Sequence, residues 1–252
     1  MKKSIKVLVA IMALCLATVF MAGCGQADVY KVITEPTFPP FDTTDENGEI
    51  TGFDMDLMQA IADDQGFDVE FESMGFDALI PAIQAGNADI IAAGMNAMDP
   101  DRQKKVDFSE TYYDSGLVVL VKEDNNSIKS INDLTPDMKV ASQIQTTGGD
   151  KANELAKAGK IKEAVILDQF DTCVLQVISG DVQAVIIDKP VAAQYIKKQP
   201  GKVKMVGDTL NAESYGFAVA KGNTELLDKI NAGLKNMIDN GTYDELYDKW
   251  FN

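Results

Sequence analysis

Two segments that share one pattern decide the expected fold: ALIPAIQAGNADIIAAG at residues 78–94 and CVLQVISGDVQAVIID at residues 173–188. Each reads as an apolar helix, then Gly-Asn or Gly-Asp, then a short apolar strand. A short apolar run next to turn residues is typical of a strand that is buried on both faces of a sheet. Repetition of this unit within one chain predicts two sheets, each with its own hydrophobic core.

Strands and helices alternate through most of the chain around this repeat. Hydrophobic periodicity predicts strands at residues 29–34, 69–74, 88–94, 116–122, 139–143, 164–167, 184–188 and 215–221. It predicts helices at residues 53–67, 77–86, 149–159, 172–180, 190–198, 224–241 and 243–251. Such alternation favours an α/β fold whose parallel sheets are covered by helices on both faces.

The composition excludes several functions. The chain has 252 residues, enough for one large domain or two small ones, and a formal net charge of −16. Nucleic acids and anionic membrane surfaces select for clustered Lys and Arg, so neither is an expected partner. The chain contains no histidine, which excludes Ser-His-Asp catalysis and histidine metal sites. We expect no cofactor and no bound metal.

The N-terminus has the pattern of a secretory signal peptide at residues 1–23. A short basic start precedes an apolar stretch at residues 7–21, and small residues follow it. The sequence AGC that ends at Cys24 resembles a bacterial lipobox, whose cysteine is lipidated and becomes the mature N-terminus. An ordinary signal peptide with an incidental cysteine is the alternative. We therefore expect a lipid-anchored protein outside the cytoplasm, on the extracellular face or in the periplasm, with residues 24–28 as its tether.

Oppositely charged side chains follow the two repeated strands. Ligands of open α/β sheets bind beyond the carboxyl ends of the strands, and these two strands end at Gly94 and at Asp188. Arg102, the only arginine in the chain, follows the first and could grip a carboxylate through two parallel hydrogen bonds. Two facing lobes would then offer both partners of a zwitterionic α-amino acid. Alternatively, Arg102 and Asp188 only cap helices.

Seven segments carry a wider resemblance. They are TFPPFD (37–42), GEITGFDMDLMQAIA (48–62), FDALIPAIQAGNADIIAAGM (76–95), DRQKKVDFSETYYDSG (101–116), QTTGGD (145–150), GDVQAVIIDKP (180–190) and NGTYDELYDKWF (240–251). Together they resemble the extracellular solute-binding proteins that deliver amino acids to ABC importers, the polar amino acid or family 3 group. The resemblance runs from about Val29 to Phe251.

This resemblance implies a type II periplasmic-binding-protein-like fold, in which two α/β lobes are joined by two hinge strands. Residues 29–111 and 217–252 would form lobe 1, and residues 117–211 would form lobe 2. The hinges would be residues 112–116 and 212–216. In such proteins the lobes close on the ligand by hinge motion. We expect the chain to act as a monomer.

The resemblance also implies a binding site. Arg102 would clamp the carboxylate of the ligand, and Asp188 would bind its ammonium group. Groups at Gly94, Asn96 and Thr147 would help to hold the carboxylate. A buried zwitterion needs both charges paired, because otherwise its desolvation opposes binding. Thr147 has an alternative role as the N-cap of the helix that follows it.

Three further residues would contact the ligand side chain. Phe38 and Phe76 would sandwich it between their rings; alternatively, both are aromatic residues of the core. Glu35 lies where the family often has a polar residue that contacts the end of the ligand side chain. The alternative for Glu35 is a solvated acid at the end of a strand.

The chain departs from the family pattern at three places. Between Gly94 and Arg102 it is one residue longer than usual, which predicts a rebuilt loop. Asn96 stands where Thr or Ser is usual. Gln145 replaces a common glycine, which predicts either an added side chain in the pocket or a bent loop.

The leading hypothesis is a substrate-binding lipoprotein of an amino-acid ABC transporter. It would capture an L-amino acid in the cleft and deliver it to the membrane permease. Glu35 suits an ammonium, guanidinium or amide tip, which favours a polar or cationic ligand. One alternative is an enzyme on the same fold, similar to cyclohexadienyl or arogenate dehydratase, with Glu35 as general acid. The other is a sensor that reports the ligand to a membrane partner.

Overall fold

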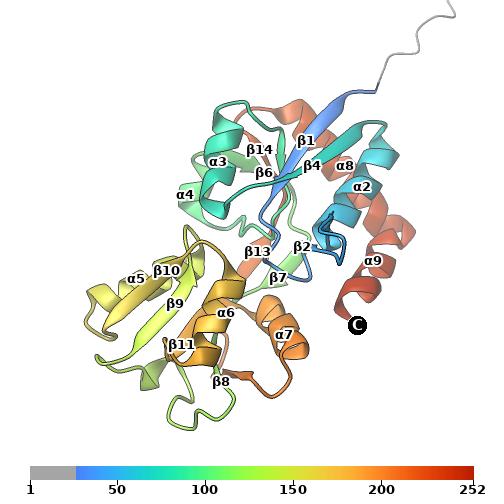
Figure 1. Cartoon of the computed structure of the whole chain (residues 1–252). Helices are drawn as coiled ribbons and strands as arrows, with labels where there is room; N and C mark the ends of the chain where they lie inside the picture. The colour runs from blue at the N-terminus through green and yellow to red at the C-terminus, as the bar shows by residue number, and fades with distance from the viewer. Residues whose placement is uncertain (1–26) are drawn as a thin grey trace, which may run out of the picture.

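The computed structural model describes residues 27–252. Two lobes lie one above the other, and two short strands cross between them (Figure 1). The predicted signal peptide and the lipidation at Cys24 lie outside the described residues, so both stay predictions. Within the described range, no helix has the length and apolar character needed to cross a membrane.

Lobe 1 is built on a five-stranded sheet with the order β4-β1-β5-β14-β6. Its strands are β1 (Val29–Thr34), β4 (Asp68–Ser73), β5 (Ile90–Ile91), β6 (Val106–Phe108) and β14 (Ala218–Ala220). The helices of this lobe are α2 (Phe53–Gln65), α3 (Phe76–Gln84), α4 (Pro100–Gln103), α8 (Thr224–Asn240) and α9 (Thr242–Phe251). A small hairpin contains β2 (Thr43–Thr44) and β3 (Ile50–Thr51). The chain leaves this lobe after β6 and returns to it at β14.

Lobe 2 contains a second five-stranded sheet, with the order β10-β9-β11-β8-β12. Its strands are β8 (Leu117–Lys122), β9 (Lys139–Gln143), β10 (Glu163–Leu167), β11 (Ala184–Asp188) and β12 (Val203–Val206). Its helices are α5 (Thr147–Lys157), α6 (Phe170–Ser179), α7 (Lys189–Lys198) and the 3₁₀ helix η2 (Ile131–Asp133). The two sheets with their helices confirm the predicted α/β class with two lobes.

One strand in each sheet runs against its neighbours, so the prediction of parallel sheets was wrong for these strands. β14 pairs antiparallel with β5 and β6, and β8 pairs antiparallel with β11 and β12. β8 and β14 are each the first strand that the chain forms after crossing between the lobes. A strand that arrives from the crossing runs away from the cleft, whereas β5 and β11 end at it.

Two short strands form the connection between the lobes. They are β7 (Tyr113–Ser115) and β13 (Glu213–Tyr215), and they pair with each other in antiparallel register. The predicted single strand at residues 215–221 was wrong, because this stretch contains the last residue of β13 and, after a break, the whole of β14. Gly216 and Phe217 lie between the two strands. This break lets the chain turn from the connection into the sheet of lobe 1.

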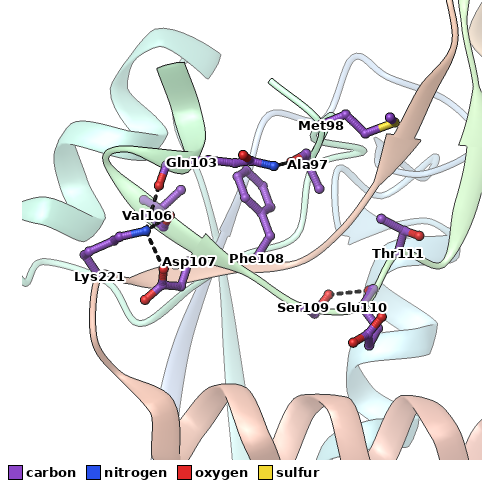
Figure 2. A pocket seen from close by; sticks show the side chains of 10 residues that line it. All are labelled: Ala97, Met98, Gln103, Val106, Asp107, Phe108, Ser109, Glu110, Thr111 and Lys221. Atoms are coloured by element: carbon purple, nitrogen blue, oxygen red, sulfur yellow. Dashed lines mark hydrogen bonds and ion pairs between the residues drawn. The ribbon is translucent and has the colours of Figure 1, made fainter. Parts of the chain in front are cut away.

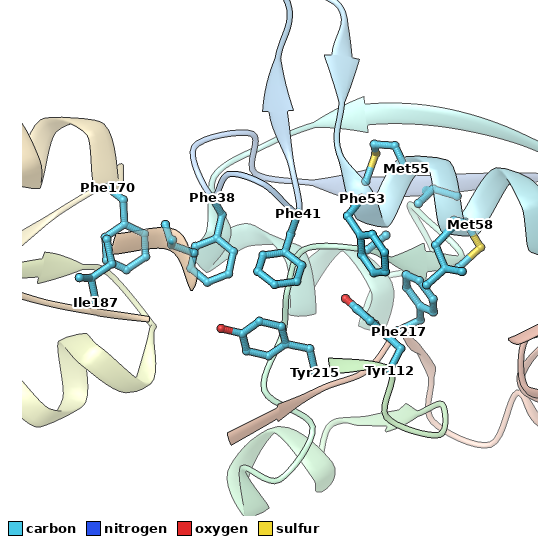
Figure 3. Close-up of a cluster of buried hydrophobic side chains, with 14 of the residues drawn as sticks. Phe38, Phe41, Phe53, Met55, Met58, Tyr112, Phe170, Ile187, Tyr215 and Phe217 are labelled. Carbon is cyan, nitrogen blue, oxygen red and sulfur yellow. The ribbon is translucent and has the colours of Figure 1, made fainter. Parts of the chain in front are cut away.

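An aromatic cluster joins the cores of the two lobes. The repeat predicted a separate core for each sheet, and this prediction was wrong at the boundary between the lobes. The ring of Phe38 lies 5.7 Å from that of Phe170 in lobe 2 and 5.8 Å from that of Phe41 in lobe 1. Phe41 in turn packs against Phe53 and Tyr215 (Figure 3). Each lobe also has an aliphatic cluster of its own. The shared cluster places Phe38 at the boundary between the lobes.

Candidate functional site

The carboxyl ends of strands from both sheets meet at one buried cavity between the lobes. Its lining residues are Phe38, Phe76, Ala93, Gly94, Asn96, Arg102, Gln143, Thr146, Thr147, Asp188 and Glu213. Every residue predicted for the ligand site lines this cavity except Glu35, which contacts the lining residue Gln143. The cavity volume is about 20 Å³, which is room for about one water molecule. In this arrangement of the lobes the cavity has no room for a molecule much larger than water.

Arg102 reaches from lobe 1 to lobe 2. Its Nη2 donates to the main-chain carbonyl of Gln145 at 3.0 Å, and its Nη1 donates to the carbonyl of Asn96 at 3.5 Å. The Nε atom lies 3.7 Å from Oδ2 of Asp99, and the guanidinium carbon lies 5.4 Å from the centre of the Phe76 ring. The side chain is buried, which lowers the pKa of Arg102. The two carbonyl groups fix the position of the buried guanidinium group. A planar guanidinium group fixed in this way suits a carboxylate, which it can bind through two parallel hydrogen bonds.

The helix that carries Arg102 is a single turn with its own cap. Pro100 begins α4, and Oδ1 of Asp99 accepts the main-chain N–H groups of Asp101 at 2.8 Å and Arg102 at 3.2 Å. Proline at the first position and an Asp cap both favour a helix start. The cap is therefore Asp99, and the alternative role of Arg102 as a helix cap is not what the structure contains.

The loop between β5 and α4 is held by the side chain of Asn96, which bonds to the main chain of the loop and of the crossing strand β13. Gly94 has a positive φ of 50°, and a Cβ atom there would lie 2.5 Å from Cε1 of Phe38. Oδ1 of Asn96 accepts the N–H groups of Met98 at 3.0 Å and Ser214 at 3.4 Å. The side-chain oxygen of Asn96 thus holds the loop, while its carbonyl faces Arg102.

Gln145 has the left-handed backbone conformation, with φ 58°. Glycine adopts this conformation without strain, which accounts for the glycine usual in the family at this position. Gln145 is exposed, and its side chain is not part of the cavity lining. Of the two outcomes predicted for this replacement, the added side chain in the pocket is therefore wrong, and the bent loop stays a prediction.

Gln145→Gly should raise the free energy of unfolding by about 1 kcal/mol, because a non-glycine residue in the left-handed region costs about 1–2 kcal/mol, part of which glycine loses again in the unfolded chain. Urea unfolding of the ligand-free protein measures this gain. Gln145→Ala is the matched control, since it removes the side chain but keeps the Cβ atom. An equal gain in the alanine variant would show that backbone strain is not the cause.

Asp54 helps to hold the loop between β5 and α4, although Asp54 does not line the cavity. Its Oδ2 accepts the N–H of Gly94 at 2.8 Å and the hydroxyl of Tyr112 at 2.7 Å. Its Oδ1 has no hydrogen-bond partner in the described part of the chain. Burial raises the pKa of Asp54 from 3.8 to about 7, so this carboxyl titrates near neutral pH.

The stability of the ligand-free protein should fall as the pH rises through the pKa of Asp54. The folded state keeps this proton at pH values where the unfolded chain has lost it, so the contribution is full below about pH 4 and lost through about pH 7. Asp54→Asn should therefore flatten the pH dependence. Urea unfolding at about pH 5.5 and pH 8.5 measures it. An unchanged difference between the two pH values in the variant would contradict the role of Asp54.

Asp188 ends β11 beside the crossing strands. Its Oδ1 accepts the hydroxyl of Tyr215 at 2.5 Å. Its backbone stands at the N-cap of α7, but its side chain makes no capping hydrogen bond, so the capping alternative does not describe this carboxyl. Burial, and next to it the charge of Glu213, raise the pKa of Asp188 well above its usual value. A cation in the cavity would restore the charged form.

The first residue of α5 lies on the lobe 2 side of the cavity. The N-cap of this helix is Thr146, not Thr147. Oγ1 of Thr146 accepts the N–H of Gly149 at 3.0 Å, and α5 begins at Thr147. The alternative prediction of Thr147 as the cap, and the predicted helix start at residue 149, were therefore wrong. As the first residue of α5, Thr147 lies on the cavity lining near the positive end of the helix.

Glu35 joins the two lobes at the other end of the site. Its Oε2 accepts Nε2 of Gln143 at 2.7 Å and Oγ1 of Thr37 at 2.7 Å, and its Oε1 accepts Nε2 of Gln169 at 3.4 Å. Burial raises the pKa of Glu35. The alternative of a solvated acid does not describe this side chain, which is 3% exposed.

Sequence reasoning missed Gln143, Gln169, Tyr215 and Glu213 near the site. Gln143 is the last residue of β9 and corresponds in position to Asp188 at the end of β11, so the strand-end rule would have found it. Glu213 and Tyr215 lie on the crossing strand β13, which is three residues long. No periodic pattern marks a strand of that length.

A larger groove lies on lobe 1, outside the cleft. It has a volume of about 520 Å³ and is lined by Ala97, Met98, Gln103, Val106, Asp107, Phe108, Ser109, Glu110, Thr111 and Lys221 (Figure 2). Its lysine is already used, since Nζ of Lys221 lies 2.6 Å from Oδ1 of Asp107 and donates to the carbonyl of Gln103 at 2.7 Å. A zwitterion needs a cation and an anion at the same site. The interlobe cavity offers both, in Arg102 and Asp188.

Comparison with known proteins finds a matching family and sequence relatives over most of the chain. The model of the bacterial extracellular solute-binding proteins, family 3, matches residues 30–252. The arginine-binding periplasmic protein of Mannheimia haemolytica is 33% identical to this chain, over 87% of this chain and 90% of its own length.

Two solved structures have the same fold. An ancestral arginine-binding protein bound to arginine matches with a TM-score of 0.84 and 45% identity, over 89% of this chain and 98% of its own. An ancestral amino acid-binding protein, a precursor of cyclohexadienyl dehydratase, matches with a TM-score of 0.82 and 42% identity, over 89% and 96%. Because the family match covers nearly every described residue, this chain belongs to the bacterial extracellular solute-binding proteins of family 3.

Proposed function

We propose that this protein binds an L-amino acid between its lobes and delivers it to the permease of an ABC transporter. One observation carries the proposal: a buried guanidinium fork and a buried carboxylate, Arg102 and Asp188, line the same cavity from opposite lobes. The carboxylate of an α-amino acid matches the first and its ammonium group matches the second. The N–H at the start of α5 and the main chain at Gly94 would complete the carboxylate site.

The proposed ligand has a polar or cationic side chain. The carboxyl group of Glu35, with the amides of Gln143 and Gln169, gives the end of the site acceptors for an amide, ammonium or guanidinium group. Phe38 and Phe76 would pack on the aliphatic part of such a side chain. The relative from Mannheimia haemolytica and the ancestral protein bound to arginine support this ligand class.

Ligand binding is proposed to close the two lobes about the crossing strands. The lobes would be residues 29–111 with 217–252, and residues 117–211, with hinges at 112–116 and 212–216. Direct bonds already span the cleft, such as Tyr195 Oη to the carbonyl of Thr37 at 2.9 Å. Residues that bond across the cleft without a ligand would also help to hold the closed form around one.

The proposed setting is the outer side of a bacterial cell membrane. The family consists of extracellular proteins, and a lipid on Cys24 would keep this one at the surface as a monomer close to its permease. Intact-mass analysis of the protein purified from membranes would test the anchor, since processing and lipidation at Cys24 alter the mass in a defined way.

A thermal-shift screen of residues 25–252 tests the function. The protein is unfolded and refolded to remove carried-over ligand, then heated with each of the twenty amino acids, ornithine, citrulline, cystine, prephenate and arogenate. A ligand at about 100 times its dissociation constant should add about 2.7 kcal/mol of stability. We expect a large shift with one or a few polar or cationic amino acids. The absence of a shift with every amino acid would refute the proposal.

Catalysis on the same fold is the second candidate. The ancestral precursor of cyclohexadienyl dehydratase favours it, as does the raised pKa of the buried Glu35 carboxyl, which suits a general acid. Turnover or a shift with prephenate or arogenate, together with silence from the amino acids, would establish this candidate. Glu35→Gln would then be expected to abolish turnover.

A further inference from the structure

Glu213 is a buried carboxyl group to which the proposed function gives no role. It lies on β13, is 2% exposed, and lines the cleft cavity together with Asp188. Its Oε1 accepts Nδ2 of Asn211 at 2.9 Å, whereas its Oε2 has no hydrogen-bond partner among residues 27–252. A buried carboxylate oxygen without a partner is costly. It needs either a proton of its own or a donor from a bound molecule.

The geometry of β13 directs Glu213 toward Asp188. Glu213 and Tyr215 are two residues apart on this strand, so their side chains project from the same face. The Tyr215 hydroxyl donates to Oδ1 of Asp188, which shows which way that face points. Two ionised carboxylates only accept hydrogen bonds and cannot bond to each other. One proton held between them would supply the missing donor and remove their repulsion.

The other charged and titratable groups near the pair do not neutralise it. Arg102 attracts both Glu213 and Asp188, but its guanidinium donates to main-chain carbonyls and lies beside Asp99. Asp150 of lobe 2 also acts on Arg102 and adds negative charge. Tyr215 offers one hydroxyl, and no lysine lines the cavity. Among the described residues that line the cavity, the two carboxyl groups therefore have one cation, Arg102, and it is already bonded elsewhere.

We propose that Asp188 and Glu213 together bind the ammonium group of the ligand, that they share one proton in the ligand-free protein, and that ligand binding releases this proton to solvent. This inference rests on the proposed function, since it takes the ligand to be an amino acid. An ammonium group carries three N–H donors and can bond both carboxylates at once. Its positive charge replaces the proton, so one proton leaves for each ligand that binds.

The proposal has a thermodynamic consequence. Because a proton and the ligand compete for the same two carboxylates, affinity should rise with pH until the pair is fully ionised in the ligand-free protein. Glu213 is then a specificity-determining residue. A carboxylic acid of the same size without an ammonium group could not displace the shared proton. The remaining negative charge of the Asp188–Glu213 pair would then have no cation as its partner. The site would select an ammonium group over a neutral hydroxyl at the same carbon.

Calorimetry of residues 25–252 with L-arginine tests the proton release, with L-glutamine and L-histidine as the next probes. Titrations at about pH 7 in phosphate and in Tris differ in heat by the number of protons released times the difference in buffer ionisation enthalpy. We expect about one proton per ligand in the unmodified protein and in Glu110→Gln, the matched change at an exposed position. Glu213→Gln should bind more weakly and release a smaller fraction of a proton, because Asp188 no longer shares its proton with a second carboxyl group.

Glu35→Gln separates the two possible sources of the proton. Glu35 is also a buried carboxyl, and a cationic ligand side chain could displace a proton from it. If the release comes from the Asp188–Glu213 pair, it persists in Glu35→Gln and falls in Glu213→Gln. Equal heats in both buffers, or a release as large in Glu213→Gln as in the unmodified protein, would overturn the proposal.

A measurement without ligand distinguishes failure of the proposed ligand class from failure of the shared proton. If none of the three amino acids produces heat, the proposed ligand class is wrong, but the shared proton can still be tested. The free energy of unfolding should fall less with rising pH in Glu213→Gln than in Glu110→Gln, because only the former lacks the pair. The same fall in both variants would overturn the shared proton.

Discussion

Asp188→Asn should remove most of the amino-acid affinity, about 3–5 kcal/mol, the range for a buried, hydrogen-bonded charge that loses its partner. Asparagine keeps the shape of the side chain and still accepts the hydroxyl of Tyr215, but it carries no charge for the ligand ammonium. At about 1.4 kcal/mol for each tenfold change, the dissociation constant should rise by more than about a hundredfold. Isothermal titration calorimetry with the amino acid found in the screen measures it.

The same substitution should act in the opposite direction on the ligand-free protein. Burial raises the pKa of Asp188, which means that the charged form is disfavoured in the folded state, so a neutral amide should keep or raise stability at about pH 8. Thermal unfolding without ligand measures this effect. Asp208→Asn removes the same charge at an exposed position of lobe 2 and should change neither property. Unchanged affinity in Asp188→Asn would exclude this carboxylate from the ammonium site.

Arg102→Lys should keep the fold and weaken binding by about 2–3 kcal/mol, the scale for a truncated hydrogen bond to a buried charge. Lysine keeps the positive charge, but it cannot present two parallel N–H donors to a carboxylate. It would also lose part of the contact with the Gln145 carbonyl across the cleft. Calorimetry with the same ligand gives the affinity, and urea unfolding gives the stability of the ligand-free protein.

The control for Arg102→Lys is the reverse change at an exposed neighbour. Lys104→Arg lies next to the end of the same helical turn, and its side chain is 73% exposed, so it should leave affinity unchanged. Unaltered affinity in Arg102→Lys would refute the carboxylate clamp. A large loss of stability with little loss of affinity would instead assign Arg102 to the contact between the lobes.

The parts of the fold that depend on the hydrophobic pattern of neighbouring residues could be predicted from the sequence. The repeated helix-turn-strand units predicted the strands that became β5 and β11, because a run of apolar side chains shows burial without reference to the rest of the chain. Strand direction could not be predicted in this way. β8 and β14 are as apolar as their neighbours, and only the path of the chain through the crossing sets them antiparallel.

The site could be predicted in part. Arg102 and Asp188 stand out because one comes shortly after a buried strand and the other ends one, and because Arg102 is the only arginine in the chain. Glu213 carries no such mark, since glutamate before a short aromatic segment is usually a solvated residue. Its importance appears only when β13 brings it to Asp188, 25 residues earlier in the chain by number.

By itself the sequence determined that this chain forms two α/β lobes and that opposite charges follow two of their strands. Hydrophobic periodicity and strand ends are properties of neighbouring residues, so they can be recognised in the sequence alone. Only the tertiary structure decided which groups meet. It brought Arg102 to the carbonyl of Gln145, Glu35 to the amide of Gln143, and Glu213 to Asp188. Burial and the resulting pKa shifts depend on these long-range contacts, because the cost of a charge depends on what surrounds it after folding.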